Sequence, residues 1–376
     1  MTENIWDESA IEKLGGEYNK LYNSGKNDGF SWVLDEDAKV LNLKKEKINN
    51  SDSNKKKAGK LNLNMDKTSV NLGLPSQVHG DAKNAKFFLC LLNPRVQDSK
   101  KLKEKEDTLK GKNMSIEDYK NIENKNDDEY FEDLNKYYTH IKDEQNILAK
   151  EYIYAKNNSD SSDDSLYYLS HYYYFMFEKK EEQGKKGAKE KGINTFLSKN
   201  KAEIEELDIC NLELFPYRAE SKPKGGLFKS EKTYKDLESS KYVANIILDR
   251  VKKANSVKKS DKNSEDTPIF VFRSYGEWFE ILLQEFAKRK GFKKIDEEPT
   301  KEKGPTEEEK KSKNIEEKEN LENIILKQYL EATNDYFYEF PNQNAALTKN
   351  NLKSVLTGEK ISNDNYEKIQ NIFKLD

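Results

Sequence analysis

Three short apolar runs, separated by long polar stretches, dominate the hydrophobic pattern of this 376-residue chain. The first, residues 86–92 (KFFLCLL), has no alternation of apolar and polar positions, which is typical of a strand covered on both faces. Residues 207–217 (LDICNLELFPY) and 268–274 (PIFVFRS) have the length and apolar content of two further strands. The pattern predicts that these segments form the buried centre of a sheet.

Helical spacing accounts for much of the remaining hydrophobic pattern. Apolar residues recur with a helical period over 234–254 and 275–289, and the aromatic-rich residues 165–180 predict a buried helix. A weak strand is expected at 323–329, and a short helix at the end of the chain. Because strands and helices alternate, the sequence predicts an α/β fold, a three-layer α/β/α sandwich with a mostly parallel central sheet.

Charge-rich stretches suggest how the chain is divided. Residues 1–70 are expected to form an N-terminal extension that packs on the core, and residues 71–376 the main domain. Within this domain, residues of about 98–164 and 293–320 consist largely of Lys, Glu, Asp and Asn. These two segments are therefore expected to be charged, partly helical insertions on the surface.

Composition narrows the functional classes. Lys and Arg number 66 against 69 Asp and Glu, a formal net charge of -3, so the chain is not a globally basic nucleic-acid binder, although a local basic face is compatible with it. No apolar run approaches the ~20 residues of a membrane helix, and the amino terminus lacks the apolar stretch of a signal peptide. A cytoplasmic protein without membrane contact is expected.

The chain contains two cysteines, Cys90 and Cys210, and both lie in predicted strands. Buried free thiols behave as small hydrophobic groups, so both are expected to be reduced core residues. Two cysteines are too few for a cysteine zinc site or a four-cysteine iron–sulfur cluster, and no Gly-rich loop has the spacing of a Walker motif. No cofactor and no metal are expected.

The candidate chemistry begins where the first strand ends, at Asn93 and Pro94. Pro94 fixes its own φ and disfavours the helical region for Asn93, which should therefore be extended at the carboxyl end of the strand. Open α/β sheets bind their ligands at this edge. The alternative is that Asn93 caps the turn or the next helix.

Four segments together resemble the uracil-DNA glycosylase superfamily. LLNPR (91–95) is similar to the strand and Asn-Pro turn of its mismatch-specific branch, and ICNLELFPYRAESKPKGG (209–226) to its base-reading strand. PIFVFRSYGEWFEILL (268–283) resembles its strand, glycine turn and helix, and QNAALT (343–348) its late loop. The segments occur in the order that the superfamily uses and span roughly residues 74 to 355.

The resemblance implies an enzyme that hydrolyses the N-glycosidic bond of a base in DNA. Asn93 would orient the attacking water, Gln343 would stand where the superfamily has a His that stabilises the leaving base, and Leu347 would be the wedge pushed into the duplex. The chain departs from the pattern at Leu91 and Arg95, in place of glycines, and at Gln343 and Ala345. These departures suggest a modified or different base, as in defence against foreign or phage DNA.

Further residues are candidates for substrate contacts, each with a structural alternative. An Asn can read a base edge, aromatic rings can stack on a base, and arginines at strand ends suit phosphate. Each has a structural alternative: Asn211 could form hydrogen bonds with a neighbouring loop, and the aromatic rings at 215–217 could pack in the core. His79 could be structural, and Leu347 could make a hydrophobic contact with the following helix. The predicted substrate-binding residues are Pro94, Arg95, His79, Asn211, Phe215, Tyr217, Arg218, Arg273 and Leu347.

Two rival functions are compatible with the sequence. A module on the same fold could bind nucleic acid or a protein partner without catalysis, which the loss of the late-loop His at Gln343 favours. An α/β hydrolase or transferase acting on free nucleotides would be expected to carry a phosphate-cradling loop, and no Walker spacing is found. The base, the DNA strand preference and the oligomeric state do not follow from the sequence.

Overall fold

The computed structural model describes most of the predicted core. Its described residues are 34–40, 76–94, 142–143, 145–159, 161–162, 165–178, 187–217, 231–260, 267–291, 323–331, 333, 336–340 and 346–374. The predicted insertion at 293–320 lies outside these ranges, as does most of the segment at 98–164.

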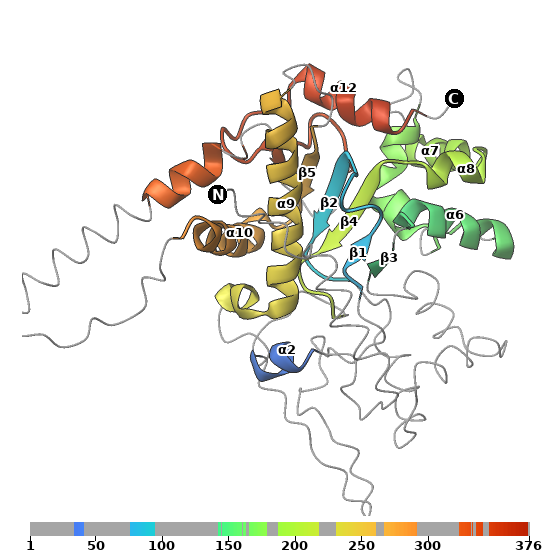
Figure 1. Ribbon diagram of the computed structural model, residues 1–376. Coiled ribbons are helices and arrows are strands. Elements are labelled where there is room, and N and C mark those ends of the chain that lie inside the picture. The colour runs from blue at the N-terminus through green and yellow to red at the C-terminus, as the bar shows by residue number, and fades with distance from the viewer. Residues whose placement is uncertain are drawn as a thin grey trace, which may run out of the picture.

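The strands of the described residues form one seven-stranded, mostly parallel sheet (Figure 1). Its central strands β4, β2, β5 and β6 are all parallel, which confirms the predicted α/β class. β1 is antiparallel to β4, and β7 to β6, while β3 pairs parallel to β1. In spatial order the strands are β3 (Lys142–Asp143), β1 (Val78–His79), β4 (Ile209–Glu213), β2 (Phe87–Leu91), β5 (Ile269–Phe272), β6 (Phe337–Glu339) and β7 (Lys353–Ser354).

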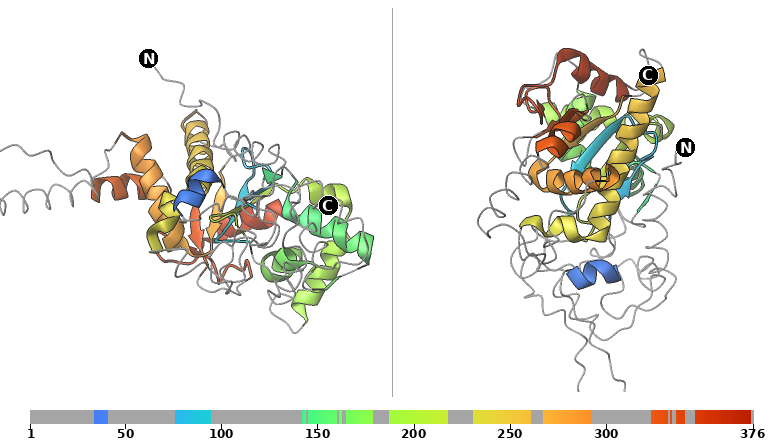
Figure 2. Two further views of the ribbon diagram at one scale, coloured as in Figure 1. Left: turned by 90° about the horizontal axis from the view of Figure 1, so that it is seen from below. Right: turned by 60° about the vertical axis from the view of Figure 1, so that its left-hand side comes forward.

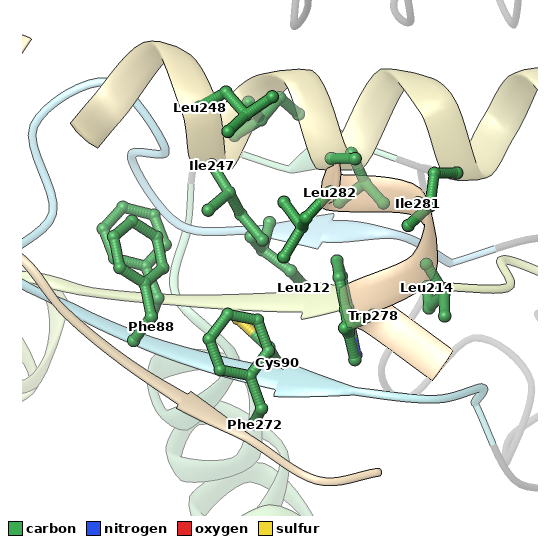
Figure 3. Packing of buried hydrophobic residues seen from close by; sticks show 14 of the residues in the cluster. Phe88, Cys90, Leu212, Leu214, Ile247, Leu248, Phe272, Trp278, Ile281 and Leu282 are labelled. Carbon is green, nitrogen blue, oxygen red and sulfur yellow. The ribbon is translucent and has the colours of Figure 1, made fainter. Parts of the chain in front are cut away.

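One face of the sheet packs against two long helices, α9 (Glu238–Ser260) and α10 (Tyr275–Arg289). Figure 3 shows Phe88, Cys90 and Phe272 of the sheet together with Trp278 of α10 in this layer. The Trp278 indole N–H donates a hydrogen bond to the Leu91 carbonyl at 3.1 Å, which joins α10 to the end of β2.

The opposite face is covered by a larger number of shorter helices, seen on the other side of the sheet in Figure 2. Because helices cover both faces, continuous apolar strands are the favoured sequence for this sheet. These helices are α6 (Ile147–Asn158), a π-helix η1 (Leu169–Tyr173), a 3-10 helix η2 (Tyr174–Phe177), α7 (Ala188–Leu197), α8 (Lys201–Glu205) and α12 (Asn363–Ile372).

The N-terminal helix α2 (Asp35–Val40) contacts α9 and the 3-10 helix η4 (Glu231–Asp236). Leu34 and Asp37 are buried there, so this part of the predicted N-terminal extension packs on the core. Cys90 and Cys210 are free and buried, as predicted. Among the described helices, none is both long and apolar enough to cross a membrane.

One secondary-structure prediction was wrong. Residues 323–331 are helical rather than a strand: Ile325 and Tyr329, four residues apart, are buried, whereas Ile324 is 50% exposed. The segment at 98–164 is not wholly a surface insertion, because Ile147 and Leu148 of α6 are fully buried in the core. The predicted helix at 165–180 exists, but as a π-helix followed by a 3-10 helix.

Gly80 provides a test of how closely β1 and β4 approach each other. Its φ is +114°, and a Cβ built there would lie 2.1 Å from the Ile209 carbonyl oxygen. Gly80→Ala should therefore lower the free energy of unfolding by about 3 kcal/mol or more, through overlap and backbone strain. Urea unfolding measures this change.

The matched control is Gly187→Ala. Gly187 also has a positive φ, +84°, but a Cβ there would have no atom of the described residues within 4 Å. Only the backbone cost of about 1–2 kcal/mol is expected. Equal losses for the two variants would contradict the close approach at Gly80.

Candidate functional site

The parallel strands β4, β2 and β5 end at the same edge of the sheet, and Asn93 follows the central one. Its side chain is half-buried. The amide Nδ2 donates to the Pro94 carbonyl at 3.3 Å, a local turn contact, and the Oδ1 atom has no hydrogen-bond donor among the described residues. Pro94 is buried beside it. The edge therefore carries one amide oxygen that can accept a hydrogen bond.

A buried carboxylate stands on one side of this position. Glu213 is the last residue of β4, pairs with Leu91 in the sheet register, and is 1% exposed. Its side chain faces the layer of short helices, where Oε1 accepts a hydrogen bond from the Tyr168 hydroxyl at 3.2 Å. The tyrosine hydroxyl offsets part of the cost of burying a charged group.

An arginine stands on the other side. Arg273 directly follows β5, and its backbone N–H donates to the Cys90 carbonyl at 2.8 Å. Its half-buried guanidinium donates from Nη1 to the Tyr172 hydroxyl, with Cζ 6.0 Å from the centre of the Tyr172 ring. The hydrogen bond and the cation–π contact hold the guanidinium at this edge.

Both tyrosines come from the segment 165–178, whose start is fixed by Glu151 of α6. The Glu151 carboxylate accepts hydrogen bonds from the backbone N–H groups of Tyr168 at 2.6 Å and Leu169 at 2.8 Å. Burial raises the pKa of the Tyr172 hydroxyl well above its usual value, and proximity to Tyr167 raises it further. Tyr172 is therefore protonated at neutral pH. We call Asn93, Glu213, Arg273, Tyr168 and Tyr172 the edge cluster.

His79 and Asn211, predicted to contact substrate, lie together but away from the strand ends. They are register partners across β1 and β4, and each is 1% exposed. Asn211 Oδ1 accepts a hydrogen bond from the Tyr173 hydroxyl at 2.7 Å, and the His79 ring lies 2.5 Å from the Ser76 hydroxyl. These contacts are structural, which is the alternative to substrate binding that the sequence left open for both residues.

Phe215 and Tyr217 pack on the opposite face of the sheet from the edge cluster, within the core beneath α9 and α10. Their rings meet edge to face with centroids 5.2 Å apart. The Tyr217 hydroxyl donates to Asp37 Oδ2 at 2.7 Å and accepts from the Leu34 N–H at 3.0 Å. In this structure both residues have core roles, and Tyr217 fastens α2 to the domain.

The late loop reaches the edge cluster through its backbone. The Leu347 N–H donates to the Tyr172 carbonyl at 3.1 Å, and the Leu347 carbonyl accepts from the Tyr366 hydroxyl at 3.0 Å. The Leu347 side chain is fully buried, a packing role rather than an exposed wedge. Gln343, Arg95 and Arg218 lie outside the described residues.

Sequence reasoning placed Asn93 and Arg273 at this edge but missed Glu213, Tyr168 and Tyr172. The tyrosine-rich run at 165–180 was a signal, since so many hydroxyl groups in a buried helix need polar partners. Nothing in the sequence around Glu213 shows that its carboxylate is buried.

Within the described ranges, no group of three or more His, Cys, Asp or Glu side chains could hold a metal ion. No protein-family model, no curated protein and no solved structure matches the chain. The fold and the edge cluster define an α/β protein with an amide, a carboxylate and a guanidinium at the carboxyl edge of its parallel strands.

Tyr217→Phe tests the attachment of α2. The substitution keeps the ring but removes the hydroxyl that bridges Asp37 and the Leu34 N–H, so the free energy of unfolding should fall by about 1–3 kcal/mol in urea titrations. Tyr174→Phe is the control, because the partly buried Tyr174 hydroxyl has no hydrogen bond among the described residues; its change should be within about 0.5 kcal/mol. Similar losses in both variants would contradict the bridging role.

Asp37 gives a pH-dependent test of the same attachment. Burial raises the pKa of the Asp37 carboxyl, because desolvation outweighs the hydrogen bonds from Ser239 and Tyr217. A pKa that is higher in the folded state contributes stability below the unfolded pKa, and this contribution is lost as the pH rises through the folded pKa. The stability of the wild type relative to Asp37→Asn should therefore fall over the pH range above about 4, by at most ~1.4 kcal/mol per pH unit. Urea unfolding of both proteins across this range measures the difference between their free energies of unfolding. A difference that stayed constant or increased with pH would contradict the prediction.

Proposed function

We propose that the protein is a DNA glycosylase-like hydrolase that cleaves the N-glycosidic bond between a base and deoxyribose in DNA. The observation that carries this proposal is the half-buried Asn93 at the carboxyl end of the central strand, with an amide oxygen that no described donor satisfies. Such an oxygen, between a carboxylate and a guanidinium, is suited to hold a water molecule against a substrate.

The arrangement of the four segments that resemble the uracil-DNA glycosylase superfamily supports the proposal. Three of them supply the ends of β2, β4 and β5, which meet at one edge of the sheet. The fourth reaches the same edge through the hydrogen bond from the Leu347 N–H to the Tyr172 carbonyl. Segments far apart in the sequence are thus gathered where open α/β sheets bind ligands.

The proposed reaction is a substitution by water at C1′ of the sugar. Asn93 Oδ1 accepts a hydrogen bond from the water, whose oxygen forms the new bond to C1′ while the base departs with the electrons of the C1′–N bond. The water's proton passes to the departing base or to solvent. Because an amide is a poor base, catalysis would depend on positioning rather than on proton removal.

The charges at the edge fit this reaction. The sugar becomes cation-like as the base leaves, and Glu213, the buried carboxylate beside the end of β2, would stabilise that positive charge through space. Arg273 on the other side is suited to phosphate. Gln343 and Ala345, in place of the superfamily's His and Ser, favour a modified or different base over uracil, as expected of an enzyme directed at foreign DNA.

A second function is favoured by two specific contacts. Asn211, the residue expected to read the base, is bonded to Tyr173, and Leu347, the expected wedge, is buried. A protein in which these two residues are structural could bind nucleic acid, or a protein, without cleaving it.

Incubation with a panel of duplexes tests the proposal. The duplexes carry uracil, a mismatch, or hydroxymethylated or glucosylated cytosine, and alkali treatment then breaks the strand at abasic sites. The wild type should cleave at least one duplex, and Asn93→Ala should reduce the single-turnover rate by about 100-fold or more, since the water loses its orienting group.

The matched control is Asn194→Ala, at an exposed position of α7, which should cut like the wild type. If the wild type leaves every duplex intact, the enzymatic proposal fails. If Asn93→Ala cuts as fast as the wild type, the role of Asn93 fails although the activity stands. Salt-sensitive DNA binding without cleavage would identify the binding module instead.

A further inference from the structure

Arg273 is a half-buried cation with few side-chain partners among the residues that the structure describes. Its guanidinium makes one hydrogen bond, from Nη1 to the Tyr172 hydroxyl, and its remaining N–H groups have no acceptor among the described residues. No described carboxylate forms an ion pair with it, although Glu213 lies near enough to affect the same tyrosine. A partly desolvated charge without a counterion is costly, and a bound anion would offset that cost.

The register places this cation close to Asn93. Phe272 pairs with Cys90, so Arg273 lies beside Leu91, on the face where Leu91 and Val271 pack. Asn93 is two residues further along the neighbouring strand, which corresponds to roughly 8 Å between the two backbone positions. A ligand that spans this backbone separation could contact both residues.

We infer that Arg273, positioned by Tyr172, is an anion subsite that binds a phosphate group next to the nucleoside held at Asn93. The inference rests on the proposed function and specifies its substrate: a nucleotide that carries a phosphate, rather than a free nucleoside or base. A guanidinium fork pairs with two phosphate oxygens at once, and Tyr172 fixes the plane of the fork through its hydroxyl and its ring.

The start of α10 follows Arg273 in the chain and carries charge of both signs, because the Glu277 carboxylate stands in its first turn beside the partial positive charge of the helix end. The helix begins at Tyr275, two residues after Arg273, and its N-cap residue Ser274 makes no side-chain capping hydrogen bond. The first N–H groups of a helix carry partial positive charge that favours an anion. Gly276 in the first turn is exposed, and a Cβ there would meet no atom of the described residues within 4 Å.

The phosphate could belong to a DNA strand or to a free nucleotide, and two probes distinguish these sources. One is a short oligonucleotide with a non-cleavable tetrahydrofuran abasic residue, studied with each phosphate in turn replaced by a neutral methylphosphonate. The other is a set of 2′-deoxynucleoside 5′-monophosphates beside the corresponding nucleosides. Binding is measured by fluorescence anisotropy for the first probe and by calorimetry for the second.

Arg273→Gln should weaken oligonucleotide binding about tenfold. It should also reduce the slope of log affinity against log salt concentration by about the amount of one phosphate contact. Wild type should lose affinity when one particular phosphate is neutralised, and Arg273→Gln should be insensitive to that replacement. Tyr172→Phe should give a smaller loss at the same phosphate with the salt dependence unchanged, because the cation remains but is less well oriented. A purely structural role of Tyr172 would not restrict its effect to one phosphate.

The matched control is Lys288→Gln, which removes one exposed cation at the far end of α10, about 20 Å from its start. If Arg273→Gln behaves like this control, or the methylphosphonate scan is the same in wild type and Arg273→Gln, the subsite is overturned. It is also overturned if wild type binds neither probe. If binding depends on Arg273 but no duplex is cleaved, the subsite is supported and the proposed hydrolysis is refuted. If only mononucleotides bind tightly, the phosphate belongs to a free nucleotide.

Discussion

Because β2 is buried on both faces, this strand can present a polar side chain to a ligand only where it leaves the sheet. All five residues of β2 are at most 4% exposed, and the neighbouring strands β4 and β5 are equally buried. Their parallel direction brings three strand ends to one edge, which gathers Glu213, Asn93 and Arg273 from distant parts of the sequence. The two-sided core therefore places the accessible polar groups of these three strands at their ends.

Burying charge at that edge requires partners that the sheet cannot supply. The segment at 165–178 supplies them, because its π-helical turn and the Glu151 carboxylate place Tyr168 at Glu213 and Tyr172 at Arg273. A hydroxyl hydrogen-bonded to each of the two groups offsets part of its desolvation cost. The carboxylate and the guanidinium can thus stay apart, on the two sides of Asn93, instead of forming an ion pair.

The sequence predicted the parts of the fold that local pattern determines. Continuous apolar runs gave β2, β4 and β5, and the period of 3.6 residues gave α9 and α10. The pattern failed at 323–329, where an apolar run too short to show its period was read as a strand. It also failed at α6, which lies in the segment assigned to the surface for its charged composition, although Lys150 and Glu151 of this helix are buried. Asn93 and Arg273 could be predicted because strand ends are visible in sequence; Glu213 could not, because its burial depends on a tyrosine 45 residues away.

The position of the polar residues along β4 decides which of them can act at the edge. Asn211 and Glu213 point to the same face, but Asn211 is two residues further from the strand end, paired with Leu89 rather than Leu91 and bonded to Tyr173. The group on β4 nearest to Asn93 is consequently a carboxylate and not an amide. With a cation on the β5 side, the edge is electrically polarised across the strands, so a nucleotide bound there would have its phosphate toward Arg273 and its cation-like sugar toward Glu213. Under the proposed function, this orientation would follow from the two charged groups, and the two tyrosines bonded to them would act together with Asn93.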